Sequence, residues 1–176
     1  MSHRQHRSAG PASVPCAILT VSDTRRPGTD RSGPWLKTHL ERAGHEVVAT
    51  AIVPDDPAAV RARLRAFARA GRARAILITG GTGIAARDRT YEAVAGLLDK
   101  RLDGFGELFR ALSYREIGAA ALLSRAVAGT WQGRLVFVMP GSPAAVRLAV
   151  RRLILPVLGH AVGLLPAPGR KGRSGR

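Results

Sequence analysis

Short apolar runs alternate with helical patterns along the chain. Nearly continuous apolar, β-rich runs are typical of strands covered on both faces, and they occupy residues 16–22, 45–53, 73–79 and 134–140. Helical patterns cover residues 32–44, 57–71, 90–100 and 142–159. This alternation predicts an α/β fold, in which a mostly parallel sheet carries helices on both faces. For residues 104–130 we expect helices and a short strand near 126–130.

One predicted helix carries its own start and stop signals. Pro57 stands where the helix should begin and Gly71 where it should end, as is common for proline and glycine at helix termini. Within it, Val60, Leu64 and Phe67 share one face. That face is predicted to pack against the sheet.

Length and composition fit one globular domain. The 176 residues are 45% hydrophobic, mean hydropathy is near zero, and no apolar run approaches the roughly 20 residues that cross a bilayer. The N-terminus lacks the apolar stretch of a secretory signal, so we expect a cytoplasmic protein with no membrane partner. Cys16, the single cysteine, excludes an internal disulfide and is expected to be a buried, inert thiol. We expect an ordered domain over 14–165 between disordered basic tails, 1–13 and 166–176.

The net charge of +16 raises the question of a nucleic-acid partner. The tails contain six of the 28 basic residues and no acidic residue. Many other arginines alternate with alanine over 61–74, which is typical of a solvated helix face. We therefore do not expect a nucleic-acid partner, although the charge favours an anionic ligand.

The most informative residues directly follow the predicted strands. In a parallel sheet, ligands bind outside the carboxyl ends of the strands. Small, turn-forming or acidic residues end or follow all four runs: Ser22 and Asp23; Pro54, Asp55 and Asp56; Gly80, Gly81, Thr82 and Gly83; and Pro140, Gly141 and Ser142. The sequence predicts a binding site at this edge of the sheet.

Each group also has a purely structural interpretation. The Gly-Gly-Thr-Gly run (80–83) fits a tight turn as well as an anion-binding loop. It matches neither GxGxxG nor GxxxxGK[ST], which excludes a Rossmann or P-loop assignment. Helix capping explains Ser142 and Asp88 as well as ligand binding does, and Asp55 fits a cap for the helix that begins at Pro57.

Two acidic residues become candidates for binding a metal if they meet at the sheet edge. Neighbouring carboxylates of Asp55 and Asp88 would repel each other without a cation or proton between them. Mg²⁺ is commonly held by one or two carboxylates plus substrate phosphates, so the pair fits a Mg–nucleotide site. A zinc site is not expected, because the HxxH pair His3 and His6 lies in a tail.

Eight blocks of sequence carry a family resemblance. They are AILTVSDTR, TDRSG, IVPDD, LITGGTG with RDRTYEA, DGFGELFR, LSYREIG, LLSRAVAG and FVMPGSPAAV. In this order they resemble the MogA/MoaB family, and the SRAVAG and MPGS blocks are more similar to its MoaB branch. The resemblance runs from about Cys16 to Leu165.

The resemblance implies a three-layer α/β/α sandwich that assembles as a homotrimer or hexamer. It implies molybdopterin adenylyltransferase activity, in which AMP passes from ATP to the terminal phosphate of molybdopterin with Mg²⁺ as cofactor. The resemblance further implies a partner protein that inserts molybdenum. Some MoaB-branch chains lose the acidic pair, so the alternative is a catalytically silent molybdopterin-binding or scaffold protein.

By the same resemblance, Asp55 and Asp88 match the acidic pair of metal binding and catalysis. The family's ligand-binding loop is matched by Gly80, Gly81, Thr82 and Gly83. Other loops of the pocket are matched by Ser22, Asp23, Pro140, Gly141 and Ser142. Candidates for stabilising phosphate charge are Arg87, Arg110 and Arg125.

Overall fold

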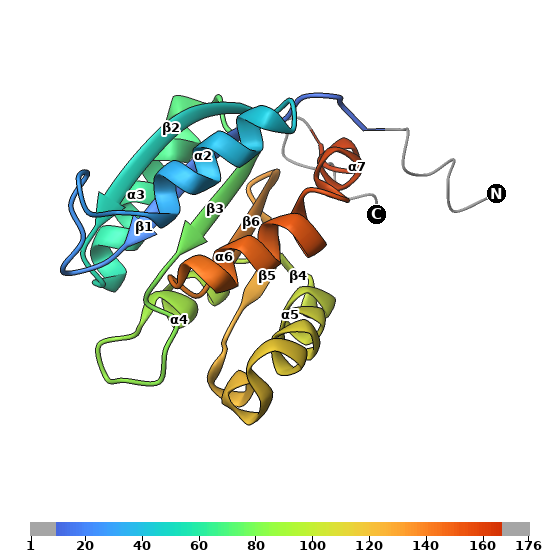
Figure 1. Cartoon of the computed structure of the whole chain (residues 1–176). Helices are drawn as coiled ribbons and strands as arrows, with labels where there is room; N and C mark the ends of the chain where they lie inside the picture. The colour runs from blue at the N-terminus through green and yellow to red at the C-terminus, as the bar shows by residue number, and fades with distance from the viewer. Residues whose placement is uncertain (1–9, 167–176) are drawn as a thin grey trace, which may run out of the picture.

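Six strands form one mixed sheet in the computed structural model, which describes residues 10–166 (Figure 1). Their order across the sheet is β2-β1-β3-β6-β5-β4. The strands are β1 (Pro15–Val21), β2 (Glu46–Val53), β3 (Ala75–Thr79), β4 (Lys100–Arg101), β5 (Val127–Trp131) and β6 (Arg134–Met139). The first four in the spatial order are parallel, whereas β5 is antiparallel to both of its neighbours. The predicted α/β class with a mostly parallel sheet is confirmed.

Helices cover both faces of the sheet and complete a three-layer sandwich. The helices are α2 (Ser32–Arg42), α3 (Pro57–Ala70), α4 (Thr90–Ala95), α5 (Asp103–Ile117), α6 (Pro143–Ala149) and α7 (Leu158–Gly163). One core cluster contains residues of α2, α5, α6 and α7, and the other contains residues of α3 and α4. Figure 1 shows α2 and α6 crossing the near face, with α3 behind the sheet.

Strand β1 shows why the apolar runs are nearly continuous. Cys16 and Ile18 belong to the core cluster on one face, while Ala17 and Leu19 belong to the cluster on the other. Successive side chains of a strand point to opposite faces, so a strand covered on both sides has no polar alternation. The Cys16 thiol is fully buried, as predicted, and burial raises its pKa to about 12.

Helix α3 begins and ends at the predicted signals. Pro57 is its first residue, and Gly71 follows its last with a φ of 74°. The cap is Asp56, whose carboxylate accepts a hydrogen bond from Ala59 N at 2.8 Å. The interpretation of Asp55 as this cap is therefore wrong. The shared face of α3 is buried as predicted, and its arginines at 63, 65 and 69 are exposed.

One predicted helix is shorter than expected, and another is divided. The helix over 90–100 ends at Ala95 because the chain beyond it pairs with the sheet edge, where Asp99 N donates to Thr130 O. The helix over 142–159 is α6, a π-helical turn (Val150–Ile154) and α7. Pro156 lies between the last two, and its ring and missing N–H prevent a continuous helix.

The segment over 104–130 contains mostly helix, as predicted. It holds α5, a 3₁₀-helix (Gly118–Leu123) and β5, whose start lies within one residue of the prediction. No helix within residues 10–166 is long and apolar enough to cross a membrane. Most of the predicted tails, at 1–9 and 167–176, lies outside the described residues.

Candidate functional site

The carboxyl ends of the parallel strands are tied together by hydrogen bonds. Ser22 N donates to Val53 O at 2.9 Å, which joins the ends of β1 and β2. The Thr79 hydroxyl donates to Pro140 O at 3.2 Å and joins β3 to β6. The loops that follow these strands therefore start from one rigid edge.

A cavity of about 570 Å³ opens among these loops. Nine of the eleven predicted site residues line it: Ser22, Gly80, Gly81, Thr82, Gly83, Asp88, Pro140, Gly141 and Ser142. A second cavity of about 740 Å³ shares Thr20, Ser22, Arg25 and Asp30 with the first, and Asp23 lines it. Asp55 lines neither cavity and lies against the glycine loop.

Glycine is required at 80 and 81 by backbone conformation and by space. Their φ angles are 103° and 63°, a region that side chains strongly disfavour. A Cβ on Gly81 would collide with the carboxylate of Asp55 and the hydroxyl of Thr90. A Cβ on Gly83 would collide with the carboxylate of Asp88. The glycines thus leave room for both acids against the loop.

The same loop offers free hydrogen-bond donors. The N–H groups of Gly81, Thr82 and Gly83 donate to no other group within residues 10–166. Unpaired N–H groups on successive residues are a feature of anion-binding loops. This favours the anion-binding interpretation of the loop over a simple tight turn.

Asp55 is held in the short turn between β2 and α3. Its Oδ1 accepts hydrogen bonds from the Thr90 hydroxyl at 3.0 Å and from Arg89 N at 3.4 Å. Its own N–H donates to Asp23 Oδ1 at 2.9 Å. Burial raises the pKa of the Asp55 carboxyl, and the charges of Asp88 and Asp23 raise it further, against the two hydrogen bonds, which lower it. The turn therefore concentrates negative charge.

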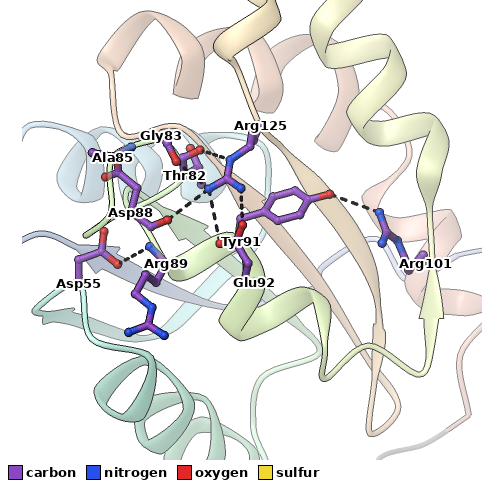
Figure 2. A network of polar contacts seen from close by, with 10 residues as sticks. All are labelled: Asp55, Thr82, Gly83, Ala85, Asp88, Arg89, Tyr91, Glu92, Arg101 and Arg125. Atoms are coloured by element: carbon purple, nitrogen blue, oxygen red, sulfur yellow. Dashed lines mark hydrogen bonds and ion pairs between the residues drawn. The ribbon is translucent and has the colours of Figure 1, made fainter.

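Asp88 lies at the end of the exposed loop before α4 (Figure 2). Its Oδ2 accepts a hydrogen bond from Ala85 N at 3.0 Å. The residue at the N-cap of α4 is Arg89, and the helix has no side-chain cap. The capping interpretation of Asp88 is therefore wrong.

The two carboxylates fit a divalent cation. Asp55 Oδ2 and Asp88 Oδ1 have no hydrogen-bond partner among the described residues, and burial, with a smaller contribution from the charge of Asp88, raises the pKa of Asp55. Within residues 10–166, no group of three or more His, Cys, Asp or Glu side chains is arranged to hold a metal. A cation at this pair would take its other ligands from a bound substrate or water, as Mg²⁺ commonly does.

Two predicted serines have local structural roles. The Ser142 side chain caps α6 by accepting a hydrogen bond from Ala145 N at 3.3 Å. Ser22 Oγ accepts from the N–H groups of Thr24 and Arg25, at 3.3 and 3.1 Å. Both residues line the cavity as well.

Asp30 is a cavity residue that the strand-end argument missed. It lies in the loop before α2, where its carboxylate accepts hydrogen bonds from the Thr20 hydroxyl at 2.7 Å and from Ser32 N at 2.9 Å. The sequence signal was an Asp just before a helix start, a common capping arrangement.

The arginines near the site differ from those proposed for phosphate. Neither cavity is lined by Arg87, Arg110 or Arg125, whereas Arg25 lines both. Arg25 lies four residues after the end of β1. The strand-end argument considered only the residues next to each strand end and therefore missed it.

Comparison with known proteins identifies the family. Residues 17–160 match the family described as "Probable molybdopterin binding domain". The chain belongs to this family. Molybdenum cofactor biosynthesis protein B of Halalkalibacterium halodurans is 51% identical over 163 residues, covering 92% of this chain and 96% of its own. The protein of the same name from Bacillus subtilis is 48% identical over 163 residues, with the same coverage of each chain.

Solved structures of family members share the fold. A crystal structure of Molybdenum cofactor biosynthesis protein B has a TM-score of 0.84 at 50% identity, covering 86% of this chain and 95% of its own. The tungsten cofactor synthesizing protein MoaB from Pyrococcus furiosus has a TM-score of 0.78 at 39% identity, covering 86% and 96%. A structure of MogA has a TM-score of 0.76 at 32% identity, covering 85% and 97%. The higher identity to MoaB confirms the predicted branch.

Proposed function

We propose that this protein acts in molybdenum cofactor biosynthesis as a Mg²⁺-dependent molybdopterin adenylyltransferase. The observation that carries the proposal is the pair of carboxylates, Asp55 and Asp88, each with one unpaired oxygen, packed against a glycine loop with unpaired N–H groups. The names of the relatives support the pathway.

Two adjoining cavities suit a reaction of two substrates. Each volume falls in the range of small-molecule sites, roughly 300–1,000 Å³. The cavity at the glycine loop would receive phosphate groups. The larger one has an apolar wall that includes Ile18, Ile52 and Val53, which suits the ring system of a substrate.

The proposed reaction joins two phosphates. An oxygen of the terminal phosphate of molybdopterin attacks the α-phosphorus of ATP, the bond from that phosphorus to the bridging oxygen breaks, and pyrophosphate leaves with the electron pair. A phosphate monoester is already largely ionised at neutral pH, so no strong base is needed. The chain must position two polyanions and stabilise negative charge.

The described residues divide this task. The N–H groups of Gly81 to Gly83 and the guanidinium of Arg25 would bind phosphate oxygens. Asp55 and Asp88 would hold Mg²⁺, which when bound supplies positive charge against the polyphosphate. Asp23 orients the turn that carries Asp55 through the hydrogen bond to Asp55 N.

A product assay tests the proposal. Purified protein with molybdopterin, ATP and Mg²⁺ should form adenylylated molybdopterin and pyrophosphate in equal amounts, and chelation of Mg²⁺ should stop the reaction. Binding of molybdopterin without turnover, with Mg²⁺ present, would instead support the silent binding or scaffold protein.

We also propose that the chain assembles as a homotrimer or hexamer. Five large apolar side chains are exposed on α5 and the following 3₁₀-helix: Leu108, Tyr114, Ile117, Leu122 and Leu123. Contiguous exposed apolar surface commonly marks a protein interface. Sedimentation velocity should give a trimeric or hexameric mass, and a monomer at all concentrations would refute the assembly. The product would pass to a protein that inserts molybdenum.

A further inference from the structure

The loop that carries Asp88 has few contacts of its own with the domain. Residues 84–87 are exposed, between buried Thr82 and buried Thr90. The loop belongs to no helix or strand, so its carbonyls need other partners. A carboxylate on such a segment is positioned only as well as the loop is anchored.

One distant side chain anchors both ends of this loop. Arg125, in the segment before β5, donates from Nε to Thr82 O at 2.9 Å and from Nη2 to Gly83 O at 2.6 Å. The same Nη2 donates to Asp88 O at 3.2 Å. Figure 2 shows the guanidinium between the start of the loop and Asp88. Because the guanidinium is planar and rigid, it fixes the separation of these carbonyls.

Neighbouring side chains hold Arg125 in place. Its Nη1 forms an ion pair with Glu92, and its guanidinium carbon lies 5.0 Å from the centre of the Tyr91 ring. The hydrogen bond from Arg125 holds the pKa of Glu92 below its usual range. On the other side, Arg101 donates to the Tyr91 hydroxyl at 3.3 Å. All three guanidinium nitrogens of Arg125 therefore donate within the protein, and the residue lines neither cavity.

We propose that Arg125 is a positioning residue, which bridges the two ends of loop 82–88 and thereby sets the place of the Asp88 carboxylate. Its role is distinct from phosphate binding. The effect on turnover rests on the proposed function, whereas the effect on the loop does not.

The test compares three variants. Arg125→Met removes the hydrogen bonds, Arg125→Lys keeps the charge but offers a single point contact, and Arg63→Met removes an equal charge from the exposed face of α3. Amide hydrogen exchange, Mn²⁺ binding in the presence of ATP, thermal unfolding and steady-state kinetics are measured on each.

We expect faster exchange at the hydrogen-bonded amides of residues 85–90 in Arg125→Met, with exchange in β3 unchanged. Loss of residues that orient metal ligands commonly costs about 10- to 100-fold in metal affinity or activity, and we expect a fall of that size in Mn²⁺ affinity and in kcat. The KM for ATP should change by less than about threefold, because no substrate contact is removed. The values of loop exchange, Mn²⁺ affinity and kcat for Arg125→Lys should lie between those of Arg125→Met and the wild type. Arg63→Met should match the wild type in all three.

Different results would overturn the proposal. A raised KM for ATP with unchanged loop exchange would show a phosphate contact. Faster exchange across the whole domain, with a large loss of thermal stability, would show a general structural role. If the wild type has no adenylyltransferase activity, the exchange and Mn²⁺ measurements still decide whether Arg125 positions the loop.

Discussion

The two proposed metal carboxylates are positioned in different ways. Asp55 lies in a short turn directly after β2, where Thr90, Arg89 and Asp23 fix its carboxylate and its backbone. Asp88 lies at the end of a longer exposed loop, whose two ends are held by Arg125. A short turn between two rigid elements has little conformational entropy to lose when it is ordered. A longer loop has more, so it needs contacts from elsewhere in the domain to hold it in one conformation.

The largest expected effect tests whether the two acids share one task. Asp55→Asn and Asp88→Asn should each lower turnover by at least about a hundredfold, because each removes negative charge from the proposed metal site. Product formation is compared with the unfolding temperature, which should stay close to that of the wild type. Full activity in either variant would show that the pair is not a single site.

The next effect tests the packing of Asp55 against the glycine loop. Gly81→Ala should destabilise the fold by about 1–3 kcal/mol, the usual cost of a left-handed backbone at a non-glycine residue, and displace Asp55 or Thr90. Denaturant unfolding and metal binding measure the two consequences.

The matched control is Gly104→Ala in α5, where an added Cβ meets no atom within 4 Å. This change should leave stability within about 1 kcal/mol of the wild type. Equal stability of the Gly81 and Gly104 variants would contradict the packing argument.

A smaller effect separates two adjacent aspartates. Asp56→Ala removes the cap of α3 and should cost about 1 kcal/mol of folding free energy while turnover stays near the wild-type value. Asp55→Asn should instead lower turnover and leave the folding free energy near the wild-type value. If Asp56→Ala instead lost turnover and kept its stability, the assignment of the chemistry to Asp55 would be wrong.

The smallest effect concerns protonation of Asp55. Burial, and then the charges of Asp88 and Asp23, raise the pKa of this carboxyl above its usual value. As pH falls, it therefore takes up a proton before an ordinary aspartate does, and binding of Mn²⁺ should weaken over the same interval. A carbon-13 NMR titration reads the pKa directly.

In Asp88→Asn, the pKa of Asp55 should move down toward the usual value, since one repelling charge is gone. An unchanged pKa would mean that the two carboxylates do not interact.

Much of the fold was predictable because its signals are local. Pro57 and Gly71 marked the ends of α3, and apolar runs marked β1, β2, β3 and β6. The errors came where tertiary contacts compete with local preference. The helix from Thr90 ended early because residue 99 pairs with the sheet edge.

The sequence by itself indicated the family, through eight blocks of resemblance. It also indicated the layered fold and nine residues of the cavity lining, because strand ends and glycine positions follow from local pattern and chain topology. Only the tertiary structure decided which acid caps α3, and that Asp30 and Arg25 join the cavity. It alone brought Arg125 to a loop 37 to 43 residues away along the chain. Such contacts depend on how the layers pack, and no local periodicity encodes them.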